Sequence, residues 1–213
     1  MKYLAIDTSN THVSIAVAVD ERFFSETLPV VNGHSEETLP LIQRLLADSG
    51  IGLAELDGII YGQGPGAFTG LRIGCGIAQG LALAHDLPLI PVPTLDVIAF
   101  QSGAPAVQVV MDARMNEVYT ASYRDGVAQT PITLQPRAAL SVPADIPLLA
   151  GDCAQELNHP GKTACELRPD AASYIRLVRR GGYAAVAPEA AGLLYIRDKV
   201  ALTAAEQQAR KHG

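Results

Sequence analysis

The sequence predicts an α/β protein made of two lobes of similar topology. Its 213 residues are enough for two lobes of about 100 residues each. An internal repeat supports the division, because a shift of 105 positions brings Leu4–Asp7 onto Val109–Asp112 and Val13 onto Val118. Each copy reads strand, aspartate, short polar turn, strand, which favours a mixed sheet with helices in each lobe. Chance similarity is the alternative, because strand–Asp–turn sequences are common.

The first lobe is expected to begin with a β-meander and to continue with helices. Alternating apolar residues predict its strands, and Asp20-Glu21 suits a tight turn between two of them. Ser35 is a suitable N-cap for the first helix, and Gly50 ends that helix. We expect strands over residues 3–6, 13–19, 22–27, 56–61 and 87–92, and helices over 34–49, 69–85 and 94–101.

The second lobe follows a linker over residues 102–105 and is harder to assign. Residues 127–170 are rich in Pro, Ala and Gly and indicate only one strand, at 148–152. We expect a helix over 171–181, partly helical chain over 188–194, extended chain over 195–197, and a polar helix or disorder over 203–211.

The charge balance argues against a free-standing nucleic-acid binder. The net charge is −6 and the pI is about 5.3, whereas contact with phosphate needs clustered Lys and Arg. Seven of the 16 basic residues nevertheless follow position 175, which allows either a solvated helix surface or a local contact with a polyanion. These residues are Arg176, Arg179, Arg180, Arg197, Lys199, Arg210 and Lys211.

Cysteine use and hydropathy indicate a cytoplasmic protein. The three cysteines are odd in number and form no C-x-x-C motif, which favours reduced thiols. The opening apolar run ends at Asp7 and is too short for a signal peptide. No segment approaches the roughly 20 apolar residues that span a membrane.

The segment 56–85 is unusual because a strand leads through a glycine-rich elbow into a helix that contains several glycines. Glycine costs about 1 kcal/mol relative to alanine inside a helix, so these positions need a compensating contact. Gly70 and Gly74 are four residues apart, as are Gly76 and Gly80, so each pair shares a helix face. Such a face lets another backbone approach, either within the fold or between subunits.

Asp7-Thr8-Ser9, at the end of the first strand, could hold a phosphate or its magnesium ion, or could be an ordinary turn. The second copy, Asp112–Met115, lacks glycines and hydroxyls, which counts against a complete nucleotide site with two loops.

Other catalytic motifs are missing from the sequence. The glycine elbow has no Lys in the P-loop position and does not fit G-x-G-x-x-G. The five histidines form no H-x-x-x-H pair, and the sequence contains no G-x-S-x-G. We therefore predict no metal site and no catalytic residue.

Several motifs resemble the TsaB (YeaZ) family. The most specific is G-P-G-A-F-T-G-L-R-I-G at residues 64–74, and His34-Ser35-Glu36, Asp112-Ala113-Arg114 and Tyr195-Ile196-Arg197 agree with it. The resemblance spans nearly the whole chain, although residues 127–187 match only loosely.

The resemblance implies a two-lobed actin-like ATPase fold of the sugar kinase/Hsp70 type, with duplicated mixed-sheet lobes. It implies an N-terminal lobe over 1–103 that carries the dimerisation helices, and a C-terminal lobe over 104–213 whose tail helix can pack back on the first lobe. Asp7, Thr8 and Ser9 would then form a vestigial phosphate loop.

The family role implied is that of a non-catalytic dimerisation subunit in the synthesis of N6-threonylcarbamoyladenosine at tRNA position 37. Its partners would be a TsaD-like paralogue and a TsaE-like ATPase, with a homodimer when alone, tRNA contact only through the complex, and no membrane. No cofactor of its own is implied, although a nucleotide at the partner interface is compatible with the family. Thr94 and Ile98 stand where TsaD-like proteins carry metal-binding histidines.

The family's dimer surface consists of two helices of the first lobe, here 34–49 and 69–85. We expect homodimer and TsaD-like complex to compete for this surface. An active ATPase or sugar kinase is the alternative reading, and a glycoprotease-like metallopeptidase a weaker one. The expected interface residues are Leu39, Ile42, Leu46, Gly70, Arg72, Ile73, Gly74, Ile77, Gly80 and Leu81.

Overall fold

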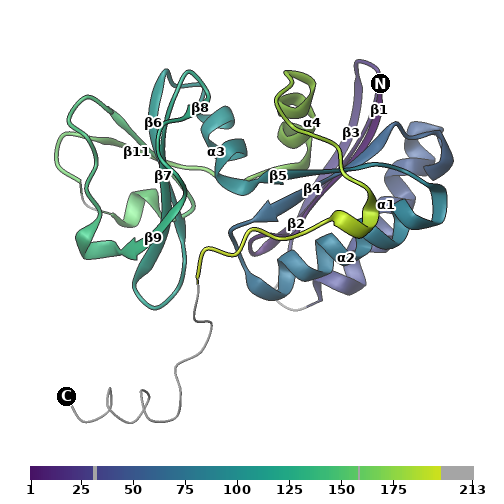
Figure 1. Cartoon of the computed structure of the whole chain (residues 1–213), viewed down its shortest axis with the longest axis horizontal. Coiled ribbons are helices and arrows are strands. Elements are labelled where there is room, and N and C mark those ends of the chain that lie inside the picture. Colours follow the sequence, from purple (N-terminus) through teal and green to yellow (C-terminus); the bar gives the residue numbers. More distant parts are fainter. Residues whose placement is uncertain (31–32, 158, 198–213) are drawn as a thin grey trace, which may run out of the picture.

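The structure, a computed structural model, describes residues 1–30, 33–157 and 159–197. Two mixed sheets lie side by side along the long axis of the molecule (Figure 1). The first has the strand order β3-β2-β1-β4-β5 and the second β11-β10-β6-β7-β8, with β9 also pairing with β7. The described chain therefore has the predicted α/β architecture with two lobes.

The first lobe follows the predicted order of elements closely. Its strands are β1 (Lys2–Asp7), β2 (His12–Val19), β3 (Arg22–Pro29), β4 (Gly58–Gly64) and β5 (Leu89–Pro93), and its helices are α1 (His34–Ser49), α2 (Phe68–His85) and α3 (Thr94–Ser102). Strand β1 pairs antiparallel with β2 and parallel with β4.

The second lobe repeats this core and then diverges from it. Strand β6 (Ala106–Asp112) pairs antiparallel with β7 (Glu117–Arg124) and parallel with β10 (Leu148–Gly151), as β1 does with β2 and β4. Between β7 and β10 the first lobe's long helices have no counterpart; short strands β8 (Val127–Ala128) and β9 (Thr133–Pro136) take their place. Strand β11 (Thr163–Glu166) follows β10 at the sheet edge.

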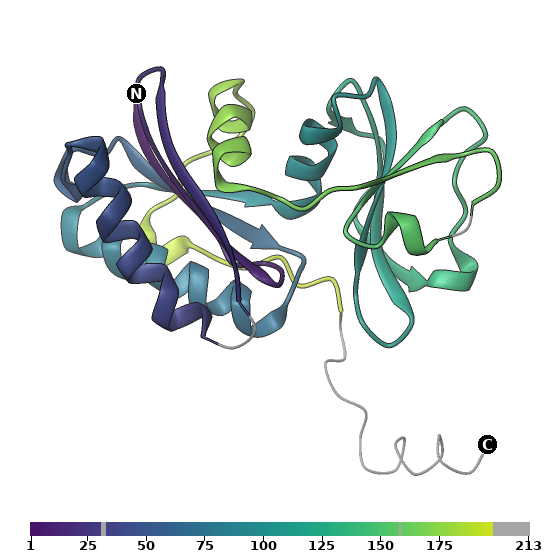
Figure 2. The same ribbon diagram turned by 180° about the vertical axis from the view of Figure 1, so that it is seen from behind.

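The two faces of the first sheet are covered by different helices (Figure 2). Leu4 and Ile6 point toward α1 and α2, whereas Ala5, between them, packs with α4 (Ala171–Arg179). This is the alternation expected of a strand that is buried on both sides. Because both faces are covered, the sheet is a rigid platform for the loops at its ends.

The chain crosses from the second lobe back to the first after β11. Helix α4, which falls within the predicted second lobe of 104–213, packs on β1 and β2 of the first sheet. The segment that follows stays on this lobe, since Val186 bridges to Leu89 and the Tyr61 hydroxyl donates to Gly192 O at 2.9 Å. The division at residue 103 stays a prediction, and the expected tail helix over 203–211 lies outside the described residues.

Candidate functional site

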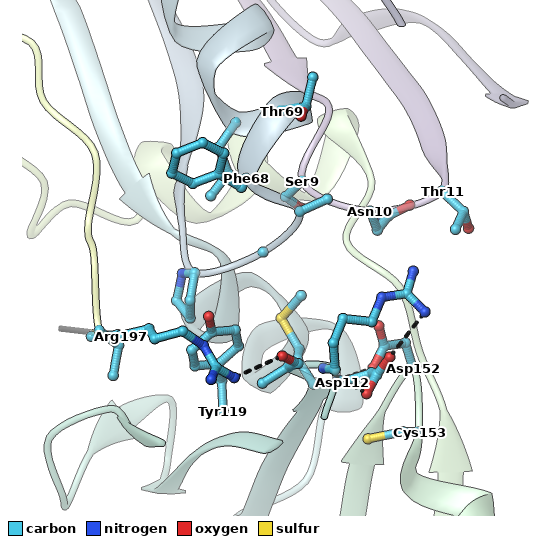
Figure 3. A pocket seen from close by; sticks show the side chains of 18 of the residues that line it. Ser9, Asn10, Thr11, Phe68, Thr69, Asp112, Tyr119, Asp152, Cys153 and Arg197 are labelled. Carbon is cyan, nitrogen blue, oxygen red and sulfur yellow. Dashed lines mark hydrogen bonds and ion pairs between the residues drawn. The ribbon is translucent and has the colours of Figure 1, made fainter. Parts of the chain in front are cut away.

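A cleft of about 840 Å³ opens between the two lobes, where loops from both sheets face each other (Figure 3). The first lobe contributes the loop Ser9–Thr11 and the start of α2 at Phe68 and Thr69. The second lobe contributes the loop after β6, which begins at Asp112, and Asp152 after β10. Ligand sites of α/β proteins often lie at the carboxyl ends of strands, so this cleft is the first place to look for a function.

The loop of Asp7, Thr8 and Ser9 is closed by contacts within the lobe. The Asp7 carboxylate is 1% exposed and accepts hydrogen bonds from Ser9 N at 2.7 Å and from Ser9 Oγ at 3.1 Å. The Thr8 hydroxyl donates to Gly70 O at 2.7 Å. Burial raises the pKa of Asp7 to about 6, and the bonds from Ser9 oppose that rise. The polar groups of Asp7 and Thr8 are thus occupied by hydrogen bonds within the protein. The role of this loop as a vestigial phosphate loop stays a prediction.

Three glycines close this loop by letting α2 and its elbow approach the backbone of the loop. A Cβ on Gly70 would lie 2.0 Å from Thr8 O, and one on Gly66 would lie 2.4 Å from Ser9 O. A Cβ on Gly74 would lie 2.4 Å from Thr8 Oγ1. The side-chain-free face of Gly70 and Gly74 is therefore filled by their own lobe, and the expectation that they contact a partner stays a prediction.

The second loop is built from charged residues that are bound to each other. Arg137 donates to Asp112 Oδ1 at 3.0 Å and to Glu156 Oε2 at 2.6 Å. Asp152 Oδ1 accepts from Asp112 N at 2.8 Å. Burial and the nearby Asp112 charge raise the pKa of Asp152. Three successive residues, 114 to 116, have positive φ angles of 64°, 53° and 61°.

The cleft's other arginines also have carboxylate partners. Arg168 pairs with Glu166 at 2.7 Å, and Arg197 pairs with Glu117 at 2.5 Å while donating to Ala113 O at 3.0 Å. A phosphate entering the cleft would have to compete with these carboxylates for every guanidinium group described here. The arrangement is therefore a poor preformed nucleotide site.

The second surface of interest is formed by α1 and α2, which lie together on one face of the first sheet (Figures 1 and 2). Leu39 is 43% exposed, and Arg72 and Gly80 are also exposed. Ile73, Ile77 and Leu81 are half-buried. Ile42 and Leu46 belong to the core of their own lobe, and their contact with a partner stays a prediction.

The predicted interface residues included Gly80 but not Gly76 or Leu83, which belong to the same exposed face. Leu83 is 56% exposed, and a side chain at Gly76 or Gly80 would meet nothing within 4 Å. Arg72, Gly76, Gly80 and Leu83 follow the helical spacing of four, four and three residues, so the sequence carried a signal for a common face. This exposed α2 stripe is open in the single chain.

An aromatic cluster joins the α2 stripe to the mouth of the cleft. The Arg72 guanidinium lies 3.6 Å from the Phe68 ring centroid, and its Nε donates to the Tyr195 hydroxyl at 3.1 Å. Phe68 is 38% exposed and Tyr195 51%. The role of Tyr195 was missed, because its contact with Arg72 joins residues 123 positions apart in the sequence.

Comparisons with known proteins identify the family. A family model described as "TsaD: tRNA N6-adenosine threonylcarbamoyltransferase" matches residues 29–143, more than half of the chain. A protein of Pseudomonas aeruginosa, described as uncharacterized with similarity to peptidase YeaZ, is 31% identical, with a TM-score of 0.83 over 92% of this chain and 99% of that one. YeaZ from the same organism is 31% identical with a TM-score of 0.81, over 91% and 99% of the two chains. The chain belongs to the TsaB (YeaZ) family.

Curated relatives carry the TsaB name. The "tRNA threonylcarbamoyladenosine biosynthesis protein TsaB" of Escherichia coli is 43% identical over 128 residues, which are 58% of this chain and 55% of that protein. The protein of the same name from Haemophilus influenzae is 42% identical over 120 residues, 54% and 51% of the two chains. The matched region thus spans about half the length of these curated relatives.

Membership of the TsaB family confirms the two-lobed actin-like fold class. At the position where TsaD-like proteins are expected to carry metal-binding histidines, Thr94 and Ile98 are both fully buried at the start of α3. Among the described residues, no group of three or more His, Cys, Asp or Glu side chains could hold a metal ion. Within the same residues, no helix is both long and apolar enough to cross a membrane.

Proposed function

We propose that this chain is a non-catalytic scaffold subunit that binds a TsaD-like paralogue for N6-threonylcarbamoyladenosine modification of tRNA position 37. A TsaE-like ATPase joins the assembly, tRNA is engaged through the complex, and the chain is a cytoplasmic homodimer when alone. The names of its curated relatives support the pathway. The match to a TsaD family model supports a paralogous partner of similar fold.

The exposed α2 stripe is the observation that carries this proposal. Glycines cost helix stability, and Gly76 and Gly80 receive no compensating contact from their own lobe. A partner's helix lying across them would gain close backbone contact, and Leu39 and Leu83 would lose their exposed apolar surface. Homodimer and TsaD-like complex would use the same surface and therefore compete.

The state of the cleft supports a role without catalysis. Asp7 and Thr8 are enclosed by their own lobe, and the cleft's arginines are bound to carboxylates. Magnesium-dependent ATP hydrolysis by the isolated chain, lost in Asp7→Ala, would contradict this part of the proposal and favour an active ATPase.

The interface is tested by Gly80→Leu, with co-purification against a TsaD-like chain from the same organism. We expect Gly80→Leu to weaken both the homodimer and the heteromeric complex at least about tenfold, because a leucine would hold the facing backbone away. The position is open in the single chain and leucine has the higher helix propensity, so the melting temperature of the monomer should not fall.

Ala128→Leu is the matched control, because it also places a leucine at an exposed position, on strand β8 of the second lobe. It should leave both assemblies intact. If Gly80→Leu pairs as well as the parent chain, the α2 stripe is not the interface.

A further inference from the structure

Helix α4 carries a concentration of positive charge that the proposed function does not use. Arg176, Arg179 and Arg180 lie at spacings of three and four residues, so they share the outer side of its last turns. No acidic residue occurs between positions 171 and 188, although the chain as a whole has a net charge of −6. We refer to these three side chains as the α4 arginine face.

Aromatic rings hold the guanidinium groups of this face in place. The Arg176 and Arg179 groups lie 4.8 and 5.2 Å from the ring centroid of Phe23 on β3. The Arg180 group lies 4.5 Å from the ring centroid of Phe100 on α3. A stacked guanidinium keeps its N–H edges available for hydrogen bonds, and its orientation is fixed before a ligand arrives.

Two of the three arginines of the face have no acidic partner within the described part of the chain. Arg176 and Arg180 make neither an ion pair nor a hydrogen bond with any residue described there. Arg179 donates only to two backbone oxygens, Met1 O at 3.0 Å and Asp20 O. The amino group of Met1 binds the Asp20 carboxylate at 2.7 Å and, with a smaller contribution from Arg179, lowers the pKa of Asp20.

The arginines of the cleft differ from those of the α4 arginine face, because they form ion pairs. Arg114, Arg137, Arg168 and Arg197 each have a carboxylate partner. The helix dipole explains why a cation suits the end of α4, but it does not explain why carboxylates are kept away. Stacked arginines without acidic partners are suited to a ligand that brings its own negative charges.

We propose that the α4 arginine face binds the phosphate backbone of RNA; the choice of tRNA as that RNA rests on the proposed function. Arginine binds phosphate oxygens with two parallel hydrogen bonds, and a regular phosphate backbone can engage several such groups. The face lies on the opposite side of the first sheet from α1 and α2 (Figures 1 and 2). RNA and a protein partner can therefore occupy the same lobe together.

The test measures binding of a tRNA transcript to the isolated full-length chain over a range of salt concentrations. Binding should be weak, with a Kd of about 1–100 μM at physiological salt, as for non-specific contacts, and tighter at low salt. Arg176→Ala/Arg180→Ala should lower affinity at about 50 mM salt by at least about tenfold. It should also reduce the slope of log K against log salt by about 2, one for each phosphate contact.

Arg44→Ala/Arg124→Ala is the matched control for net charge. Both control arginines already pair with carboxylates, Glu26 and Asp145, and lie away from α4. This control should retain most of the affinity and of the salt slope. All four side chains are solvent-accessible, so equal melting temperatures would show that each double variant is folded.

Three outcomes would overturn the proposal. The parent chain could fail to bind tRNA at the lowest salt, or the two double variants could lose affinity equally, which would show only an effect of net charge. The α4 variant could also bind tRNA normally yet fail to co-purify with the TsaD-like chain, which would make the face a protein docking site. Because the RNA measurement needs no partner, its failure leaves the scaffold proposal standing, and the reverse also holds.

Discussion

The two lobes contain the same strand–Asp–turn–strand unit, but its aspartate is buried in the first lobe and lies at the cleft in the second. Asp7 is enclosed on the α4 side of the first sheet, near Tyr174, and is bound by Ser9 of its own loop, whereas Asp112 lies at the cleft and is paired with arginines. The difference follows from the helices around the two units. The first lobe has α4 beside Asp7 and the glycine-bearing helix α2 over the rest of the loop, and the second lobe has only short strands and irregular chain between β7 and β10.

Helix α2 shows the same contrast along its own length. Gly70 and Gly74 are packed against the Thr8 backbone and side chain, whereas Gly76 and Gly80 face open space. For Gly70 and Gly74, close packing within the lobe offsets the low helix propensity of glycine. No such contact offsets it for Gly76 and Gly80 in the single chain, so a partner is proposed at this second pair and not along the whole helix.

The largest effect is expected for Gly70→Ala, which would force the covering helix off the first loop. The new Cβ would lie 2.0 Å from Thr8 O, and backbone has to move to relieve the contact. We expect a loss of about 3 kcal/mol or more in the free energy of unfolding. Urea denaturation would measure it.

Gly80→Ala is the matched control for this substitution, since its new methyl group would meet nothing within 4 Å. At concentrations where the chain is monomeric, it should raise the free energy of unfolding by up to about 1 kcal/mol, the helix-propensity difference. Similar destabilisation of both variants would show that the close approach at Thr8 is not what decides their behaviour.

A somewhat smaller effect is expected from the pH dependence of Asp7. Its folded-state pKa is raised by burial from 3.8 to about 6, so folding favours the protonated form. The resulting stability is fully present below about pH 4 and is lost as the pH rises through about 6. At about 1.4 kcal/mol per pKa unit, the loss from this group is about 2–3 kcal/mol.

Asp7→Asn should remove this contribution, because an amide does not titrate. Urea unfolding of the parent and variant at intervals between pH 4 and 7 would show a difference that grows with pH in favour of the variant. Burial raises the pKa values of Asp96 and Asp152 too, but both remain in each chain and cancel in the comparison. Parallel stability curves would show that Asp7 does not titrate in this range.

Much of the first lobe could be predicted because its elements are long and regular. The helix expected over 34–49 is α1 as observed, and the helix expected from Thr69 begins one residue earlier, at Phe68. In residues 127–170 the strand expected over 148–152 is confirmed as β10, whereas β8, β9 and β11, of two to four residues each, were not predicted. So short a strand shows no periodicity, and its position depends on pairing with distant residues.

The spacing of the glycines in α2 could not show which residues pack against them. It predicted helix faces without side chains, but Gly70 contacts Thr8, 62 positions away in the sequence, because the sheet pairs β1 with β4. The C-terminal basic residues illustrate the same limit. Arg197 lies in the cleft, whereas Arg176, Arg179 and Arg180 lie on α4, and Lys199, Arg210 and Lys211 lie outside the described residues.

The smallest expected effect concerns the loop of the second lobe, which keeps a strained backbone that no helix covers. Arg114, Met115 and Asn116 all have positive φ, a conformation that costs most residues about 1–2 kcal/mol. Met115 is 56% exposed, so Met115→Gly loses little packing and removes the clash of its Cβ. Since glycine also gains freedom in the unfolded chain, we expect a net stabilisation of only about 0.5 kcal/mol, measurable by urea denaturation. Gly103→Ala, at a helix end with φ of 60° and open space around it, should change stability by a similar amount in the opposite direction. If Met115→Gly destabilises the protein instead, contacts of the Met115 side chain hold the second loop in place, as α2 holds the first.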